Sequence, residues 1–157
     1  MIVIADTTPF NYLVQMGRVE MMRVLYEEIY IPVEVWAELR DLGTPAKVRR
    51  WAAELPEWIR VSQETQTDDP ELLALDAGEC AAIALALRLK AGLLLLDERV
   101  GRAVAVRKGV PVSGTLGVLR DGANRGLIHF EDAVAELLGL GFRASPGVID
   151  EARRDLA

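Results

Sequence analysis

The chain has 157 residues, a length that predicts one domain over residues 1–157, and a domain of this size buries roughly 70% of its unfolded surface without needing disulfides. Hydrophobic residues make up 51% of the sequence. Charges interrupt each apolar block before the ~18 residues that a bilayer span requires, and the apolar start lacks an export signal, so we expect no membrane partner and a cytoplasmic location. A formal net charge of −6 argues against coating nucleic acid by bulk electrostatics, because phosphate contacts depend on Lys and Arg.

The first half of the chain predicts strands alternating with helices. The unbroken β-branched run Met1–Ala5 predicts a strand buried on both faces of a parallel sheet. Thr8 followed by Pro9 predicts an N-cap and the start of a helix that runs to Gln15. The elements expected next are a helix over Val19–Tyr26, a strand over Glu28–Ile31, a helix from Pro32 stopped by Gly43, a helix over Lys47–Leu55, a short strand over Trp58–Val61 and a loop over Ser62–Pro70.

The second half continues the alternation. The run Glu79–Ala91 is apolar nearly all round, which predicts a largely buried helix ended by Gly92. The elements expected next are a central strand over Leu93–Leu96, a helix over Glu98–Lys108 closed by Gly109, a strand over Val110–Val112 that Pro111 confines to an edge, and helices over Leu116–Asn124, Glu131–Leu138 and Pro146–Asp155. This order predicts a three-layer α/β/α domain with a central, mostly parallel sheet.

Two carboxylates follow predicted buried strands, at the edge of a parallel sheet where ligands bind. Asp6 follows the first strand; because Thr8 with Pro9 already supplies a helix cap there, function is the better explanation for Asp6. Asp97 follows the run of four leucines, and here two alternatives stay open, a cap for the next helix or a ligand. The adjacent Glu98 is predicted to be a first-turn acid favoured by the helix dipole.

Two further acids lie on predicted helices, one at a helix start and one a turn after another acid. Glu79 lies three residues after Asp76, and an Asp-x-x-Glu capping box explains both without chemistry. Glu38 lies one helical turn after Glu34, an unfavourable like-charge spacing unless one of them serves a cation. Gathered in one cleft, four acids would carry a charge of about −4 and require a hard cation such as Mg²⁺ or Mn²⁺. These four are Asp6, Glu38, Glu79 and Asp97.

Other chemistries are less well supported. His129 is the only histidine, which excludes histidine-rich metal sites and leaves one ring for any Ser-His-Asp triad. The glycines at 114, 117 and 122 form neither a GxGxxG nor a Walker A pattern. A lone Cys80 cannot form an internal disulfide, and we expect it to be a core residue.

Four acidic motifs together resemble a known family. They are IADTTPFNYL, IPVEVWAEL, AGECAAIALA and LLLLDERVGRAVA, and the later VPVSGTLGVL resembles a subgroup with a Gly-Thr-Leu-Gly turn after the last strand. Their order and spacing resemble the PIN domain of metal-dependent ribonucleases, in particular the branch of VapC-like toxins from toxin-antitoxin pairs. The resemblance covers nearly the whole chain. Many family members carry Asp where this chain has Glu79.

The resemblance implies catalytic residues and metal ligands at Asp6, Glu38, Glu79 and Asp97, with Thr7 or Ser113 orienting them. It implies an endoribonuclease that hydrolyses RNA phosphodiester bonds with Mg²⁺ or Mn²⁺, works as a homodimer and, if a toxin, binds an antitoxin protein. The alternative is a non-catalytic PIN-like module that binds RNA or protein. A receiver or haloacid-dehalogenase-like domain ranks third, because such a first strand usually ends in several acids and here only Asp6 stands there.

Overall fold

Five short strands form one parallel sheet in the computed structural model, which describes residues 1–157. The strands are β1 Val3–Ala5, β2 Ile29–Pro32, β3 Ile59–Ser62, β4 Leu93–Leu95 and β5 Val112–Ser113. Their order is β3-β2-β1-β4-β5, and every neighbouring pair runs parallel. The central position of β1 and the parallel pairing agree with the sheet predicted from the alternation of strands and helices.

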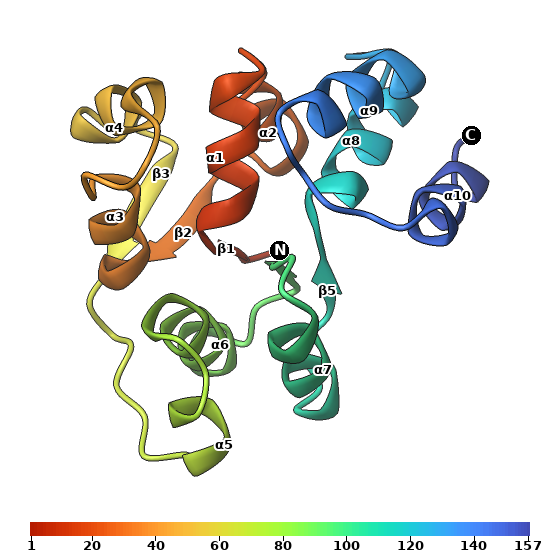
Figure 1. Ribbon diagram of the computed structural model, residues 1–157. Coiled ribbons are helices and arrows are strands. Elements are labelled where there is room, and N and C mark those ends of the chain that lie inside the picture. The colour runs from red at the N-terminus through yellow and green to blue at the C-terminus, as the bar shows by residue number, and fades with distance from the viewer.

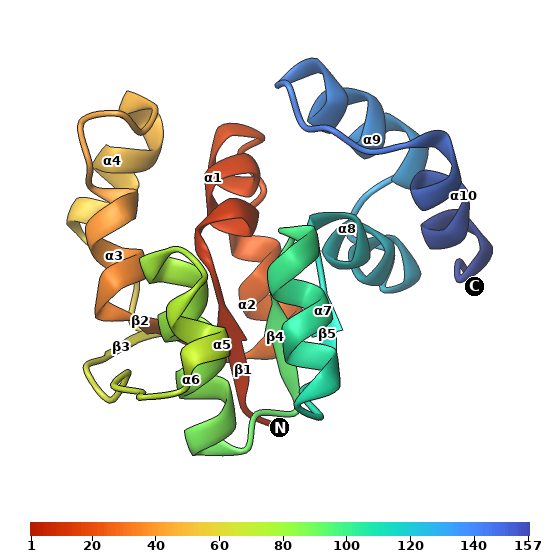
Figure 2. The same ribbon diagram turned by 60° about the horizontal axis from the view of Figure 1, so that its bottom comes forward.

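Ten helices cover the two faces of the sheet (Figures 1 and 2). Helices α5, α6 and α7 form one layer, and the remaining helices lie on the opposite side, which confirms the three-layer α/β/α fold. None of the ten is long and apolar enough to cross a membrane. The helices are α1 Thr7–Gln15, α2 Glu20–Tyr26, α3 Val33–Leu39, α4 Ala46–Ala53, α5 Pro70–Leu73, α6 Ala77–Leu89, α7 Arg99–Arg107, α8 Thr115–Asn124, α9 Phe130–Gly139 and α10 Pro146–Arg154.

The sheet separates two hydrophobic cores. Along β1, Val3 and Ala5 belong to the larger core, of 26 buried residues, whereas Ile4 belongs to the smaller, of 13. In β4, Leu95 faces the larger core and Leu94 the smaller one. Side chains that point alternately to two buried faces require apolar residues at every position, which is why these strands are unbroken hydrophobic runs.

Several helix ends differ from the predicted ones. Helix α1 begins at Thr7, so the predicted cap at Thr8 with Pro9 as first helical residue is wrong. Helix α3 ends at Leu39, well before Gly43. Helix α6 ends because Lys90 takes the left-handed conformation (φ 52°), and not at the predicted Gly92. That conformation lets the amide of residue 91 donate to the carbonyl oxygen of residue 86 at 2.9 Å, which satisfies the helix end without glycine.

Helix α5 and strand β5 also differ in part from the predicted elements. The four-residue helix α5 was not expected, and Asp69 caps it by accepting from the amide of Glu71 at 2.9 Å. Strand β5 lies at the edge, as Pro111 predicted, although it begins one residue after that proline. Pro111 still supports the pairing, because its carbonyl oxygen accepts from the amide of Leu94 at 2.8 Å.

Helix α6 offers a matched test of the smaller core. Leu85 is fully buried, whereas Leu87 on the same helix is 38% exposed. We expect Leu85→Ala to lower the free energy of unfolding by about 2–5 kcal/mol, because it leaves a cavity, and Leu87→Ala to lower it by less than about 1 kcal/mol. Urea unfolding followed by circular dichroism measures both changes. Equal losses for the two variants would contradict the orientation of α6.

Candidate active site

Asp6 stands directly after β1, at the edge of the sheet where the parallel strands end. Its backbone amide donates to the carbonyl oxygen of Leu95 at 2.9 Å, which extends the pairing of β1 with β4. Asp6 occupies the N-cap position of α1, but its side chain makes no capping hydrogen bond. The residue is only 7% exposed, and its Oδ1 is buried without a hydrogen-bond partner. Since a buried unpaired carboxylate oxygen is costly, capping does not explain this position.

Glu38 reaches the same place from the last turn of α3. The hydroxyl of Thr7 donates to Glu38 Oε2 at 2.8 Å, so the residue after Asp6 orients the glutamate, as the resemblance implied. Gly78 at the start of α6 shows how close the two acids come. A Cβ atom at position 78 would lie 3.1 Å from Glu38 Oε2 and 3.2 Å from Asp6 Oδ1. The two oxygens therefore face one point beside Gly78, which a larger residue would crowd.

Asp97 follows β4 and is held by the first residue of α8. The backbone amide of Thr115 donates to Asp97 Oδ1 at 2.9 Å, and its hydroxyl donates to Oδ2 at 2.7 Å. A Cβ at Gly114 would lie 2.5 Å from Asp97 Oδ1, so only glycine permits this close approach. Thr115 thus performs the orienting role implied for Ser113, whose hydroxyl makes no hydrogen bond to the acids.

The capping alternative for Asp97 is wrong, because Glu98 caps the following helix. Glu98 accepts from the amide of Gly101 at 2.8 Å and is therefore the N-cap of α7 and not a first-turn acid. Arg102 on the same helix donates to the carbonyl oxygen of Leu96 at 3.2 Å. Its positive charge lies near enough to Asp97 to favour the ionised carboxylate, although the net pKa of Asp97 is raised by burial.

The start of α6 supplies two acids with different environments. Asp76 is the N-cap, and its Oδ1 accepts from the amide of Glu79 at 3.0 Å, which confirms one half of the predicted capping box. The reciprocal bond from the Asp76 amide to the Glu79 side chain is absent, so Glu79 does not serve as a cap. Glu79 is 5% exposed, and its carboxyl carbon lies 3.8 Å from the Cβ position of Gly101, toward α7.

Burial and mutual repulsion link these acids electrostatically. Loss of solvation is the largest cause that raises the pKa of Asp6 to about 7, and it acts against a backbone hydrogen bond that lowers it. Repulsion raises the pKa of Asp6 further and comes from three acids, Glu38, Asp76 and Asp97. Burial likewise raises the pKa of Glu79 to about 7, with repulsion from Asp76, Glu98 and Asp6. All four predicted acids are therefore coupled through Asp6.

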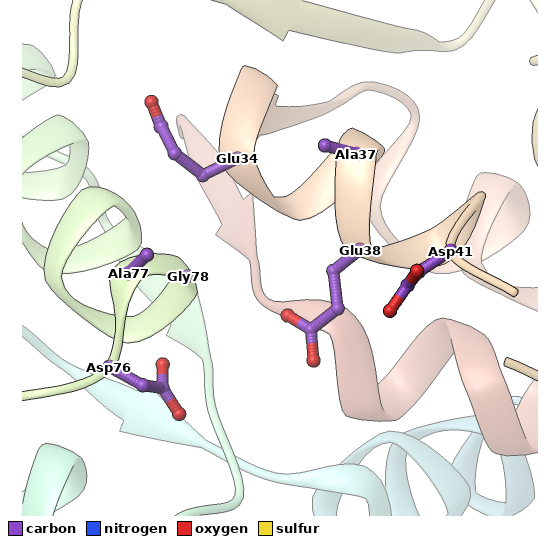
Figure 3. A pocket seen from close by; sticks show the side chains of 7 residues that line it. All are labelled: Glu34, Ala37, Glu38, Asp41, Asp76, Ala77 and Gly78. Atoms are coloured by element: carbon purple, nitrogen blue, oxygen red, sulfur yellow. The ribbon is translucent and has the colours of Figure 1, made fainter. Parts of the chain in front are cut away.

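A cleft of about 470 Å³ opens beside Gly78 (Figure 3). Its lining residues are Glu34, Ala37, Glu38, Asp41, Asp76, Ala77 and Gly78. Figure 3 shows the carboxylates of Glu38 and Asp76 pointing toward each other across the cleft, while Glu34 points away. Because four of the seven lining residues are acids and none is basic, the cleft attracts cations and repels free phosphate groups.

Two residues of this region were missing from the predicted site. Thr115 belongs to the Gly-Thr-Leu-Gly turn that the motif comparison singled out, but its partner Asp97 lies 18 residues earlier, where no spacing rule points. Asp76 had a sufficient explanation as a helix cap. The signal that could have found it is its place at the start of the most buried helix, on the side of the sheet where the strands end.

The type of donor atom in this site, carboxylate oxygen, suits a hard divalent cation. As the side chains lie, no three His, Cys, Asp or Glu residues are close enough together to surround a metal ion. The site nevertheless offers only oxygen donors, which Mg²⁺ and Mn²⁺ prefer, and the unpaired buried Oδ1 of Asp6 is an oxygen that a cation would partner.

The family model described as "DUF3368: PIN domain" matches residues 2–157. No curated protein and no solved structure matches the chain. The family match spans all four acidic motifs and confirms the PIN-domain part of the resemblance inferred from them.

The raised pKa of Asp6 predicts a dependence of stability on pH. In the unfolded chain Asp6 regains its ordinary pKa near 4, so its protonated form favours folding below that pH, and this contribution is lost as the pH rises through about 7. We expect Asp6→Asn, which stays neutral, to lose less stability than the wild type between about pH 5 and pH 8 in EDTA, by on the order of a few kcal/mol. Urea unfolding at each pH measures the difference.

The control is Asp68→Asn, because Asp68 is exposed and its side chain makes no hydrogen bond. The free energy of unfolding of this variant should change with pH as that of the wild type does. If Asp6→Asn also follows the wild type, Asp6 does not titrate in the buried environment described above.

Proposed function

Because the chain belongs to the DUF3368 family of PIN domains, we propose that it is a metal-dependent endoribonuclease that hydrolyses RNA phosphodiester bonds. PIN domains are generally nucleases, so a hydrolase is the class that the family supports. The observation that carries the proposal is the unpaired, buried Oδ1 of Asp6, which faces Glu38 at the carboxyl edge of the sheet. An ionised carboxylate buried in this way requires a positive partner.

We propose that four acids are the catalytic residues and hold Mg²⁺ or Mn²⁺. Two of them follow the ends of the neighbouring strands β1 and β4. The other two lie on helices α3 and α6, which pack against each other. When bound, the ion would polarise the phosphodiester and lower the pKa of the attacking water. The four acids are Asp6, Glu38, Glu79 and Asp97.

Two threonines orient the proposed ligands and leave lone pairs of the carboxylate oxygens free to bind a metal ion. Thr7 gives one hydrogen bond to Glu38 and leaves the other oxygen of that carboxylate free. Thr115 gives one bond to each oxygen of Asp97. Since each carboxylate oxygen accepts at two positions, Asp97 retains a free lone pair on both oxygens. Hydrogen bonds of this kind fix ligand orientation and strengthen metal binding.

Protonation of the buried acids would compete with a cation. Asp6 and Glu79 both have a pKa raised to about 7, so at lower pH a large fraction of each carries a proton where an ion would bind. Because both acids must release their protons before a cation binds, function is favoured above neutral pH. An assay at about pH 8 therefore tests the site with these two carboxylates ionised.

We propose further that the protein acts as a toxin of the VapC-like branch, in the cytoplasm, as a homodimer, with an antitoxin protein that covers the cleft. The order and spacing of the four acidic motifs support this branch. The acidic lining of the cleft supports a partner that presents positive charge there.

A non-catalytic module that binds RNA or protein is the second candidate. It is favoured by the separation of the acids, no three of which surround a common point at metal-ligand distances. The retention of all four acidic positions opposes it, since a binding module has no need to bury an unpaired carboxylate.

Cleavage of a mixed-sequence single-stranded RNA tests the nuclease directly. We expect the purified protein to cut it at about pH 8 with Mn²⁺ or Mg²⁺ and to stop in EDTA. Asp97→Asn and Asp6→Asn should each reduce cleavage by at least about 100-fold, because each removes a proposed ligand charge. Gel analysis of the products, with end-group mapping, measures both the rate and the position of the cuts.

The matched control is again Asp68→Asn, an identical chemical change at an exposed residue outside the cleft, which should keep the wild-type rate. Cleavage that persists in EDTA, or that survives in both active-site variants, would point to a contaminating nuclease. No cleavage with either ion would move the assignment to the binding module.

A further inference from the structure

Asp76 lies beside the proposed metal site but has only a helix-capping role so far. It is the N-cap of α6, and its Oδ1 accepts from the amide of Glu79 at 3.0 Å. A cap uses one lone pair of one oxygen, and no other side-chain hydrogen bond occupies this carboxylate. Asp76 also lines the acidic cleft, where Figure 3 shows it pointing toward Glu38.

Three carboxylates each place an oxygen within 4 Å of the Cβ position of Gly78, although as the side chains lie they do not yet surround a common point. A Cβ atom at that residue would lie 3.1 Å from Glu38 Oε2, 3.2 Å from Asp6 Oδ1 and 3.8 Å from Asp76 Oδ1. The three come from α3, the end of β1 and the start of α6, so the fold brings them together from distant parts of the sequence. Gly78 itself contributes no side chain to the space near these three oxygens. Like charges arranged in this way repel one another unless a cation lies between them.

A second observation, independent of the cluster, points to a ligand at this place. Asp6 is 7% exposed, and its Oδ1, the atom that faces Gly78, has no hydrogen-bond partner. The carboxyl carbon of Glu79 lies 3.8 Å from the Cβ position of Gly101 on α7. Asp76, at the same end of α6, has its Oδ1 3.8 Å from the Cβ position of Gly78, near the oxygens of Asp6 and Glu38.

We propose that Asp76 is a further metal ligand, which binds a divalent cation together with Asp6 and Glu38 beside Gly78 while it caps α6. The inference rests on the proposed metal site and adds a ligand to it. The two roles of Asp76 are compatible, because a carboxylate offers about four acceptor positions and the cap uses one. Asp76 thereby ties the position of the metal to the start of the helix that carries Glu79.

The two roles can be separated by substitution. Asn and Ser are as good as Asp at the N-cap position, so Asp76→Asn and Asp76→Ser keep the cap and remove the charge. The matched control is Asp41→Asn, because Asp41 lines the same cleft but is not one of the three acids nearest the Cβ position of Gly78. It tests whether any acid of the cleft attracts the ion merely by its field.

The experiment is isothermal titration of the folded protein with Mn²⁺, supported by electron paramagnetic resonance of the free ion. We expect the dissociation constant for Mn²⁺ to rise about tenfold or more in Asp76→Asn and Asp76→Ser. Asp41→Asn should change it by less than about threefold, since its effect is screened. Urea unfolding in EDTA should show all three variants as stable as the wild type.

Each outcome decides the matter. Unchanged Mn²⁺ affinity in both Asp76 variants overturns the inference, as does an equal loss in Asp41→Asn, and so does a wild-type protein that binds no Mn²⁺. Because binding is measured without RNA, weakened Mn²⁺ binding in a protein that cuts no RNA would support the ligand role and reject the nuclease. RNA cleavage by the wild type, together with unchanged Mn²⁺ binding in the Asp76 variants, would support the nuclease and reject the ligand role of Asp76.

Discussion

Strands β1 and β4 lie side by side with Ala5 opposite Leu95, and the amide of Asp6 continues the ladder to the carbonyl oxygen of Leu95. This pairing sets the ends of the two strands level, so Asp6 and Asp97 leave the sheet at the same edge. A slip of β1 by one residue would exchange the two cores that its side chains enter and move Asp6 away from that edge. The apolar alternation of the strands therefore determines where the charges lie.

The acidic edge is unfavourable for folding, and the rest of the structure must offset it. Asp6 and Glu79 are both almost fully buried, and burial is the main reason why the pKa of each is raised to about 7. Most of α6 beyond its first turn is buried in the smaller core, with Ile83 and Leu85 at 0% exposure. Hydrophobic burial along this helix stabilises it enough to hold a repelled carboxylate at its start. Active sites commonly combine such local cost with a rigid surrounding framework.

The layers of the fold could be predicted from the sequence because apolar runs of strand length are separated by helical stretches. Helix ends were harder, since Lys90 ends α6 in a left-handed conformation that glycine usually adopts, and the four-residue α5 is too short to show a periodic pattern. The strand-end rule placed Asp6 and Asp97 at the same edge. It could not reveal Thr115, because that contact depends on how α8 docks against the end of β4.

The role of Asp76 shows a different limit of sequence reasoning. A capping box accounts for an Asp three residues before a Glu, and the structure confirms the cap. An explanation that suffices locally hides a second role that depends on distant residues. Here that role becomes visible only when β1 and α3 bring Asp6 and Glu38 to the glycine two residues after the cap.

The hydrogen bonds from Thr115 to Asp97 also order events during synthesis. Asp97 emerges from the ribosome 18 residues before the threonine that holds both of its oxygens, and before the edge strand that leads to it. Strands β1 and β4 also precede Thr115 in the chain, so Asp97 lacks its permanent partner until that residue has emerged. A nascent protein of this design acquires its complete acidic edge only after α8 has been translated, so its carboxylates reach their final arrangement late in its production.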